Sequence, residues 1–257
     1  MFQKKAKIIY NKIIKDNYFS CLLDVPRMAG CARPGQFLQV KVGDNYEPLL
    51  RRPFSIHNVD KGRVEIIYEV LGQGTEILSQ KKAGESLSVI GPLGNGFDYS
   101  GKQAAVLVAG GMGVAPLLFL AKKIAPSKII VFIGAKGKKQ ILCEKEFHKL
   151  GCGVKIATDD GSRGFKGKVT QLLNKFLDDN KITGQQTMIY ACGPRPMLKE
   201  ISKISKNYKI PAQISLEEHM ACGIGACFGC VVNTSDGLKR VCKEGPVFAA
   251  SKIILTK

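Results

Sequence analysis

The first hundred residues alternate between short apolar runs and turn-forming Pro, Gly and Asp residues. Every second side chain from Val64 to Val70 is apolar, and Glu65 and Glu69 lie between them, which is the period of a half-buried strand. Similar runs recur throughout this region, at residues 6–14, 18–25, 36–42, 63–70 and 86–90. Several short strands with such punctuation predict a small antiparallel β-barrel.

The pattern changes near Gly101. Apolar runs at residues 104–109, 129–133, 154–157 and 188–191 alternate with helical segments at residues 114–124, 141–150, 169–177 and 195–207. This alternation predicts a doubly wound parallel sheet with helices on both faces. A last apolar run, residues 213–216, precedes a cysteine-rich segment. The expected fold is therefore β plus α/β, with domains at residues 1–100, 101–212 and 213–257.

Composition excludes some classes of protein. The hydrophobic content of 45% is that of an ordinary globular chain, and no run approaches the ~18 apolar residues of a membrane span. The N-terminus lacks the apolar core of a signal peptide, so we expect a cytoplasmic location. The net charge of +18 comes mostly from Lys residues spread along the chain, which we interpret as solvated surface, with a docking face for an acidic protein as the alternative. No basic block interleaved with aromatic residues is present, so nucleic-acid binding is not expected.

Four of the nine cysteines are closely spaced, as C-x4-C-x2-C-x11-C: Cys222, Cys227, Cys230 and Cys242. An odd cysteine count without an export signal argues against disulfides. The spacing is typical of plant-type [2Fe–2S] sites, and glycines within it let the backbone turn N–H groups toward sulfur. Structural zinc sites more often use two separated C-x2-C pairs, so zinc and free thiols are the weaker alternatives. The pattern predicts an electron-transfer protein.

Two short motifs lie in the predicted barrel, Arg51-Arg52-Pro53-Phe54-Ser55 and Gly72-Gln73-Gly74-Thr75. Together they resemble the flavin site of the ferredoxin–NADP reductase superfamily. The superfamily motif is Arg-x-Tyr-Ser/Thr, and Phe54 stands here in place of the tyrosine. Without this resemblance, the two arginines would read as surface cations of a barrel.

The resemblance implies a bound FAD. Arg52 would pair with the pyrophosphate of FAD. Phe54 would face the isoalloxazine or the adenine side of the cofactor, and the Ser55 hydroxyl would lie near the flavin ring. Gly74 and Thr75 would face the phosphates. The strand between the motifs would form the wall of the flavin site, with Ile67, Tyr68 and Glu69.

Three loops follow strands of the predicted parallel sheet and are expected at its carboxyl edge, where such sheets bind ligands. They contain Gly110, Gly111 and Gly113; Asp159 and Asp160; and Cys192, Gly193 and Pro194. Glycines before a helix admit a pyrophosphate. An aspartate that binds a ribose hydroxyl would favour NAD, whereas Lys136, Lys138 and Lys139 could meet the 2′-phosphate of NADP; we expect NADH. The third loop resembles the superfamily's nicotinamide loop, which would place Cys192 near the reacting carbon; a buried structural cysteine is the alternative.

The chain resembles the electron-transfer subunits of dihydroorotate dehydrogenase B over essentially its whole length. Like them, it has a barrel, then a nucleotide domain and then a cysteine segment. The most specific part is residues 215–230 together with residues 241–248. The family implies FAD, NAD(H) and a [2Fe–2S] cluster on Cys222, Cys227, Cys230 and Cys242. It also implies assembly with an FMN-containing catalytic subunit, two of each, for pyrimidine biosynthesis.

Similar architectures serve other electron-transfer roles, so three alternatives stay open at this point. They are a reductase subunit of a sulfhydrogenase or ferredoxin–NADP transhydrogenase, a stand-alone reductase, and a metal-stabilised regulator without flavin. All 257 residues are assigned to the three expected domains, so orotate chemistry is not expected on this chain.

Overall fold

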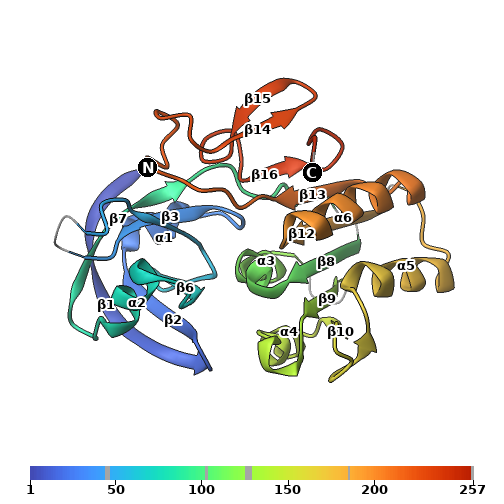
Figure 1. The fold of residues 1–257 in the computed structure, drawn as a ribbon, viewed down its shortest axis with the longest axis horizontal. Coiled ribbons are helices and arrows are strands. Elements are labelled where there is room, and N and C mark those ends of the chain that lie inside the picture. The colour runs from blue at the N-terminus through green and yellow to red at the C-terminus, as the bar shows by residue number, and fades with distance from the viewer. Residues whose placement is uncertain (44–46, 102–103, 125–128, 185, 256–257) are drawn as a thin grey trace.

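The computed structural model describes residues 1–43, 47–101, 104–124, 129–184 and 186–255. Two seven-stranded sheets lie side by side, and a small two-stranded sheet lies above the junction between them (Figure 1). The first sheet is built from the N-terminal hundred residues and the second from the remainder. The predicted combination of an antiparallel β-sheet domain with a parallel α/β domain is confirmed.

The first sheet is antiparallel and curls on itself. Its strands, in the order β4-β3-β7-β1-β2-β6-β5, are β1 (Phe2–Lys15), β2 (Tyr18–Asp24), β3 (Phe37–Lys41), β4 (Arg52–Ser55), β5 (Asn58–Asp60), β6 (Arg63–Glu69) and β7 (Ser86–Leu93). The two edge strands, β4 and β5, are joined by only Ile56 and His57. Their N–H groups donate to Gln36 O and Glu65 O, each at 2.9 Å, which closes the curl. Helices α1 (Pro26–Cys31) and α2 (Gln73–Gln80) complete this part.

The second sheet has the order β11-β10-β9-β8-β12-β13-β16. Its strands are β8 (Ala104–Gly110), β9 (Ile129–Ala135), β10 (Gly153–Thr158), β11 (Phe165–Lys166), β12 (Thr187–Cys192), β13 (Ala212–Ser215) and β16 (Val247–Ala249). All pairs are parallel except β13 with β16. The chain order reverses between β8 and β12, which is where doubly wound sheets bind ligands.

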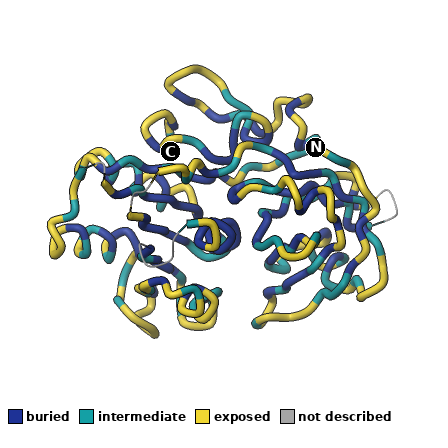
Figure 2. Tube along the Cα trace, turned by 180° about the vertical axis from the view of Figure 1, so that it is seen from behind, coloured by how far each residue is buried: buried dark blue, intermediate teal, exposed yellow. Residues whose placement is uncertain are grey.

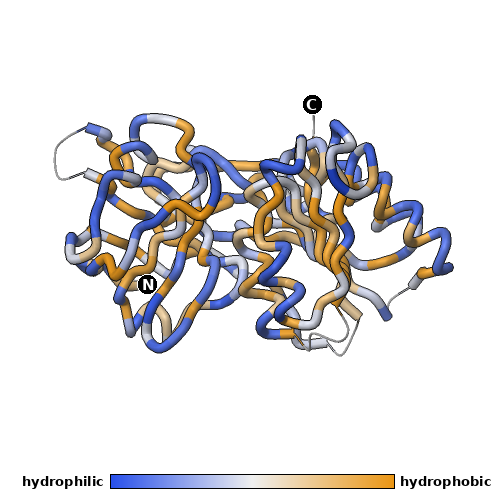
Figure 3. The backbone as a smooth tube through the Cα atoms, turned by 90° about the horizontal axis from the view of Figure 1, so that it is seen from below, coloured by the Kyte–Doolittle hydropathy of each residue, from blue (hydrophilic) through white to orange (hydrophobic). Residues whose placement is uncertain are grey.

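Helices cover both faces of this sheet: α3 (Val114–Ala121) and α4 (Glu144–Lys149) on one, α5 (Val169–Asp179) and α6 (Arg195–Tyr208) on the other. Successive side chains of β8 point to opposite faces of the sheet, so this strand contributes to the apolar core on each face. Val106 and Val108 pack with α5 and α6, whereas Leu107 packs with α3. All residues of α3 are buried, and Figure 2 shows this wholly buried helix near the centre of the molecule. Figure 3 shows the apolar strands of the second sheet running together through the chain's interior.

The cysteine segment runs between β13 and β16. It contains a two-stranded sheet, β14 (Val231–Thr234) with β15 (Gly237–Arg240), and then returns as β16 along the edge of β13. The C-terminal segment is thus joined to the second sheet by main-chain hydrogen bonds. The division of the chain at residues 100 and 212 stays a prediction. The longest helix of the described ranges, α6, has 14 residues, and none of the helices in those ranges qualifies as a membrane span.

Candidate functional site

A cavity of about 670 Å³ lies between the two sheets. The barrel side carries seven of the nine residues that the sequence indicated for flavin: Pro53, Phe54, Ser55, Ile67, Tyr68, Glu69 and Thr75. Strands β4 and β6 supply six of them, because the curl of the first sheet brings its two ends to the same opening. The opposite wall is formed by Met112, Ala115, Arg195 and residues 215–220. We call this cavity the first pocket.

The remaining two predicted flavin residues, Arg52 and Gly74, lie against each other, and each precedes a residue that lines the pocket, Pro53 and Thr75. A Cβ atom on Gly74 would come 2.7 Å from Arg52 Nε, so the guanidinium crosses the first turn of α2. Arg52 Nη1 donates to Leu50 O at 2.6 Å. Residues 72–75 form the start of α2, with Gly72 as its N-cap. A guanidinium beside a helix N-terminus is an arrangement that favours a phosphate.

Arg51 turns the other way. Its guanidinium donates to Ser88 O at 2.6 Å and to Ser88 Oγ at 2.9 Å, which joins the residue before β4 to β7. The two neighbouring arginines thus have different surroundings.

A second pocket, of about 560 Å³, lies at the carboxyl edge of the second sheet. Its lining includes four of the residues predicted for the dinucleotide: Gly110, Gly111, Asp159 and Pro194. Glu69, Leu71 and Met112 line both pockets. The two pockets therefore adjoin, and a ligand in one can meet a ligand in the other.

Asp159 is paired inside the second pocket. Its Oδ2 lies 2.7 Å from Lys168 Nζ, and Lys136 also lines the cavity. The carboxylate predicted to bind a ribose hydroxyl thus lies in a cavity that is also lined by two lysines and by Glu69 and Glu200.

Gly113 and the loop at residues 192–193 are packed tightly together. A Cβ atom on Gly113 would overlap the Cys192 carbonyl, so only glycine lets the turn after β8 approach the end of β12 so closely. Cys192 is 1% exposed and belongs to neither set of lining residues. Burial raises the pKa of its thiol. The structure thus places Cys192 in the packed core beneath the pockets, and its expected role at the reacting carbon stays a prediction.

Residues 215–220 belong to the segment that carries the family resemblance, but their place in the wall of the first pocket was not predicted. Glu217 lines the first pocket, and burial raises the pKa of its carboxyl group. Glu218 pairs with Arg195 at the start of α6 and so ties this wall to the second sheet. The wall leads directly to Cys222, which puts the cysteine loop beside the first pocket.

Backbone N–H groups of the cysteine loop are directed at sulfur. Cys222 Sγ accepts from Ala226 N at 3.3 Å and from Cys227 N at 3.4 Å. Cys227 Sγ accepts from Gly229 N at 3.5 Å, and Cys230 Sγ accepts from Cys242 N at 3.4 Å. Donors aimed at three of the four sulfurs are what thiolate ligands require, because N–H groups stabilise negative charge on sulfur.

The cysteines of the loop influence one another's pKa values. Burial alone would raise the pKa of Cys222, but N–H groups of the loop and the Cys227 side chain outweigh it and lower the pKa to about 6. Burial, and then the neighbouring Cys230, raise the pKa of Cys242 to about 12. Across the described residues, no three His, Cys, Asp or Glu side chains are gathered as for one metal ion. Four cysteine sulfurs, three of which accept hydrogen bonds from backbone N–H groups, are a donor set that fits a [2Fe–2S] cluster.

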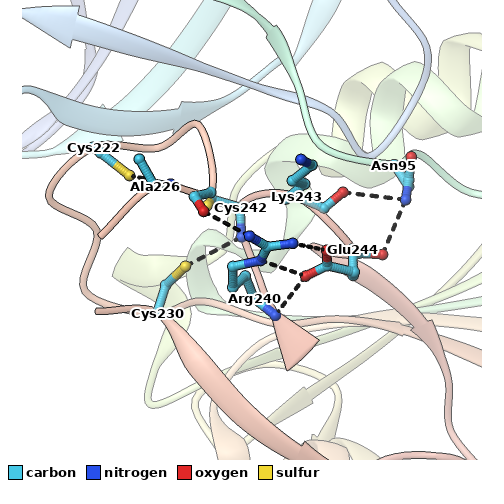
Figure 4. A network of polar contacts seen from close by, with 9 residues as sticks. Asn95, Cys222, Ala226, Cys230, Arg240, Cys242, Lys243 and Glu244 are labelled. Atoms are coloured by element: carbon cyan, nitrogen blue, oxygen red, sulfur yellow. Dashed lines mark hydrogen bonds and ion pairs between the residues drawn. The ribbon is translucent and has the colours of Figure 1, made fainter. Parts of the chain in front are cut away.

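Arg240 holds the loop to the chain that follows. Its Nη1 donates to Gly225 O at 2.7 Å and its Nε to Glu244 Oε2 at 3.0 Å (Figure 4). The guanidinium also lies over the ring of Phe228, 4.8 Å from its centroid. Asn95, from the segment after β7, donates to Glu244 O at 3.0 Å and so connects the barrel to this network.

Known proteins of similar sequence span the whole chain. It is 43% identical to the dihydroorotate dehydrogenase B (NAD(+)) electron transfer subunit of Desulforamulus reducens, over 97% of each chain. The chain belongs to this family of electron transfer subunits. A second member, from Caldanaerobacter subterraneus subsp. tengcongensis, is 38% identical over 98% of this chain and 99% of its own.

Two family models match this chain, one over the cysteine segment and one over the second sheet. The iron-sulfur cluster binding domain of dihydroorotate dehydrogenase B matches residues 217–254 of this family member, and the oxidoreductase NAD-binding domain matches residues 107–203. Residues 222–242, with all four cysteines, fall inside the first match.

Solved structures carry the same fold. A structure described as the NADH-dependent reduced ferredoxin-NADP oxidoreductase has a TM-score of 0.87 and 28% identity, covering 98% of this electron transfer subunit and 90% of that chain. The ferredoxin NADP+ reductase from Neisseria gonorrhoeae, solved with FAD and NADP, has a TM-score of 0.67 and 16% identity, covering 80% and 91%. At 16% identity, the similarity to the Neisseria gonorrhoeae reductase concerns the fold alone.

Proposed function

We propose that this chain passes electrons between NAD(H) and an FMN-containing dihydroorotate dehydrogenase catalytic subunit, through FAD and a [2Fe–2S] cluster. The observation that carries the proposal is the continuity of the three sites. The second pocket shares Glu69, Leu71 and Met112 with the first, and the wall of the first leads to Cys222 within two residues of Met220.

Each part of the chain would have a defined task. Arg52 and the start of α2 would hold the FAD phosphates, and Phe54, Ser55, Ile67 and Tyr68 would enclose its ring portion. The Gly110–Gly113 turn, Asp159 and the Cys192–Pro194 loop would hold the dinucleotide. A flavin can accept a hydride and release electrons singly, and an iron–sulfur cluster accepts one electron at a time. No side-chain acid or base is needed for that conversion.

The cluster would lie on the outer side of this path. Cys230 and Cys242 are buried, whereas Cys227 is exposed beside Phe228, which is 63% exposed. One end of the four-sulfur site thus faces solvent, where a partner would receive or supply electrons. The relatives' name, electron transfer subunit, fits such a division of labour. FMN in the partner, a heterotetramer of two of each subunit and a cytoplasmic location are parts of this proposal.

A second candidate differs only in the partner. The 28% identity and TM-score of 0.87 to the NADH-dependent reduced ferredoxin-NADP oxidoreductase favour service to a ferredoxin-linked complex. The higher identity to dihydroorotate dehydrogenase B subunits favours the pyrimidine role.

Reconstitution distinguishes these candidates. The chain is co-expressed with an FMN-containing dihydroorotate dehydrogenase catalytic subunit, and NAD+ reduction by dihydroorotate is followed at 340 nm. The proposal expects a stable complex with dihydroorotate-dependent NADH formation that neither subunit shows alone. A chain that carries FAD and cluster but neither binds the catalytic subunit nor supports this reaction contradicts the pyrimidine role.

A further inference from the structure

Gln39 is a buried amide without a hydrogen-bond partner. It lies on β3, its side chain is 0% exposed, and neither Nε2 nor Oε1 is hydrogen-bonded within the described part of the chain. Burying an amide without a hydrogen-bond partner is unfavourable, and most buried polar groups are paired. Its place in the barrel therefore calls for a partner that the protein atoms do not supply.

The Gln39 side chain, with its amide nitrogen, lies against the cysteine loop. A Cβ atom on Gly223 would come 2.5 Å from Gln39 Nε2, so the backbone next to Cys222 rests on the Gln39 side chain. Gly223 has φ +69°, a left-handed conformation that favours glycine, and this turn brings the loop down onto β3. A residue with a side chain at position 223 could not approach in this way.

The same amide lies beside the first pocket. Gln39 is paired in register with Pro53 on β4, and Phe37 precedes it by two residues on the same strand face. Pro53 and Phe37 both line the first pocket. Phe37 also packs in one apolar cluster with Cys230 and Cys242. Gln39 thus lies between the flavin pocket and the sulfur atoms.

We infer that Gln39 is a positioning residue that donates a hydrogen bond from Nε2 to the Cys222 side of the bound [2Fe–2S] cluster. The inference rests on the proposed cluster. Sulfur carrying negative charge accepts from N–H2 and repels the amide oxygen, so cluster binding fixes the orientation of the amide. An added N–H···S bond stabilises the reduced cluster more than the oxidised one, because reduction adds negative charge to the sulfurs. The amide therefore raises the reduction potential of the cluster at the side facing the flavin.

The test compares Gln39→Met with Gln213→Met in the FAD- and cluster-loaded chain. Methionine keeps the length of the side chain but donates nothing. Gln213, on β13, has its amide paired with the backbone of Asp98, so its replacement breaks ordinary hydrogen bonds instead. Anaerobic redox titration followed by EPR gives the cluster potential, and resonance Raman spectra in H2O and D2O report N–H···S bonding at the Fe–S stretching modes.

For Gln39→Met we expect a three- to tenfold smaller equilibrium constant for cluster reduction, where tenfold is about 59 mV for one electron. The deuterium shift of the Fe–S modes should be smaller in Gln39→Met than in the parent chain. Gln213→Met should leave the equilibrium constant and the deuterium shift unchanged. If Gln39→Met does not load the cluster, the same titration on Gln39→Asn decides, with a lower potential expected. An unchanged potential and deuterium shift in a loaded variant overturn the inference. Absence of any cluster from the parent chain refutes the proposed function instead.

Discussion

Arg240 and Glu244 form a two-point pair at the edge of the cysteine site: guanidinium Nε and Nη2 donate to the two carboxylate oxygens of Glu244. The pair lowers the pKa of Glu244 to about 2 and raises the pKa of Arg240. Cys242 and Cys230 are close enough to Arg240 to contribute to its raised pKa. A permanent cation is therefore held beside two of the four thiols.

Arg240→Met should make the cluster harder to reduce. Removing the cation leaves the added electron without a nearby positive charge, and the potential should fall by a few tens of millivolts, where about 59 mV is tenfold. Glu244→Gln should raise the reduction potential of the cluster, because the positive charge of Arg240 is then no longer neutralised by a carboxylate. Redox titration followed by EPR measures the potential in both variants. Shifts of the same sign in the two variants would show that loop disturbance, not charge, dominates.

Arg52→Leu should weaken FAD binding by about ten- to a hundredfold, the usual cost of losing a hydrogen bond to a charged group. The matched control is Arg51→Leu, because Arg51 is paired with Ser88 on β7. This substitution should change the dissociation constant of FAD less than about threefold. Fluorescence of released FAD gives both constants. Equal losses in the two variants would contradict the assignment of Arg52 to the phosphates.

His57 should make the fold sensitive to acid. Its Nδ1 lies 2.9 Å from Ala115 O, which joins the barrel to α3. Burial lowers the pKa of His57; Glu65 and Glu146 oppose this and Lys122 adds to it. With the folded pKa below the unfolded value of about 6.5, this histidine's contribution to stability is present above pH 6.5 and is lost as pH falls below it.

The midpoint of thermal flavin release should therefore drop more steeply between pH 7.5 and 5.5 in the parent than in His57→Asn. The control is His148→Asn, because His148 is exposed on α4. A parent-like pH profile in His57→Asn would exclude His57 as the source of the acid sensitivity.

Cys227→Ser should separate the two halves of the electron path. Loss of one thiolate should remove the cluster, while FAD reduction by NADH stays within about twofold because Cys227 lines neither pocket. Transfer to the partner should be abolished. Cys31→Ser tests an exposed cysteine away from the cluster loop and should leave iron content and transfer intact. Stopped-flow absorbance with and without the catalytic subunit supplies both rates; undiminished transfer by Cys227→Ser would refute the path.

The two sheet types could be predicted from local patterns because periods of two and alternating strand–helix runs are local properties. The run at residues 104–109 lies within β8, and the segment at residues 63–70 contains β6. Ends were less predictable: the helix expected at residues 114–124 ends at Ala121, and the strand expected at residues 6–14 spans Phe2–Lys15. Helix α1 and strand β16 were not predicted, since their place depends on distant partners.

The same limit applies to the site. The arginine motif indicated a segment that lines the first pocket, because the motif is contiguous in the chain. The cysteine spacing indicated a loop that follows the wall of this pocket in the chain without lining it. The contact of Glu217 with the first pocket and the contact of Gln39 with the cysteine loop could not be predicted in this way. Glu217 reaches the first pocket only because β13 adds to the second sheet, and Gln39 reaches the loop only through the turn at Gly223. Contacts between segments more than a hundred residues apart are set by tertiary packing.

The central claim is that Cys222, Cys227, Cys230 and Cys242 hold a two-iron cluster that receives electrons from NADH through FAD. Anaerobic NADH titration of the purified chain, followed by low-temperature EPR with iron and sulfide analysis, tests it most directly. The account predicts about two irons, two sulfides and one FAD per chain, and a reduced [2Fe–2S] signal that grows as NADH is added. Stoichiometric zinc in place of iron, or a cluster that stays oxidised while the flavin is fully reduced, would contradict it.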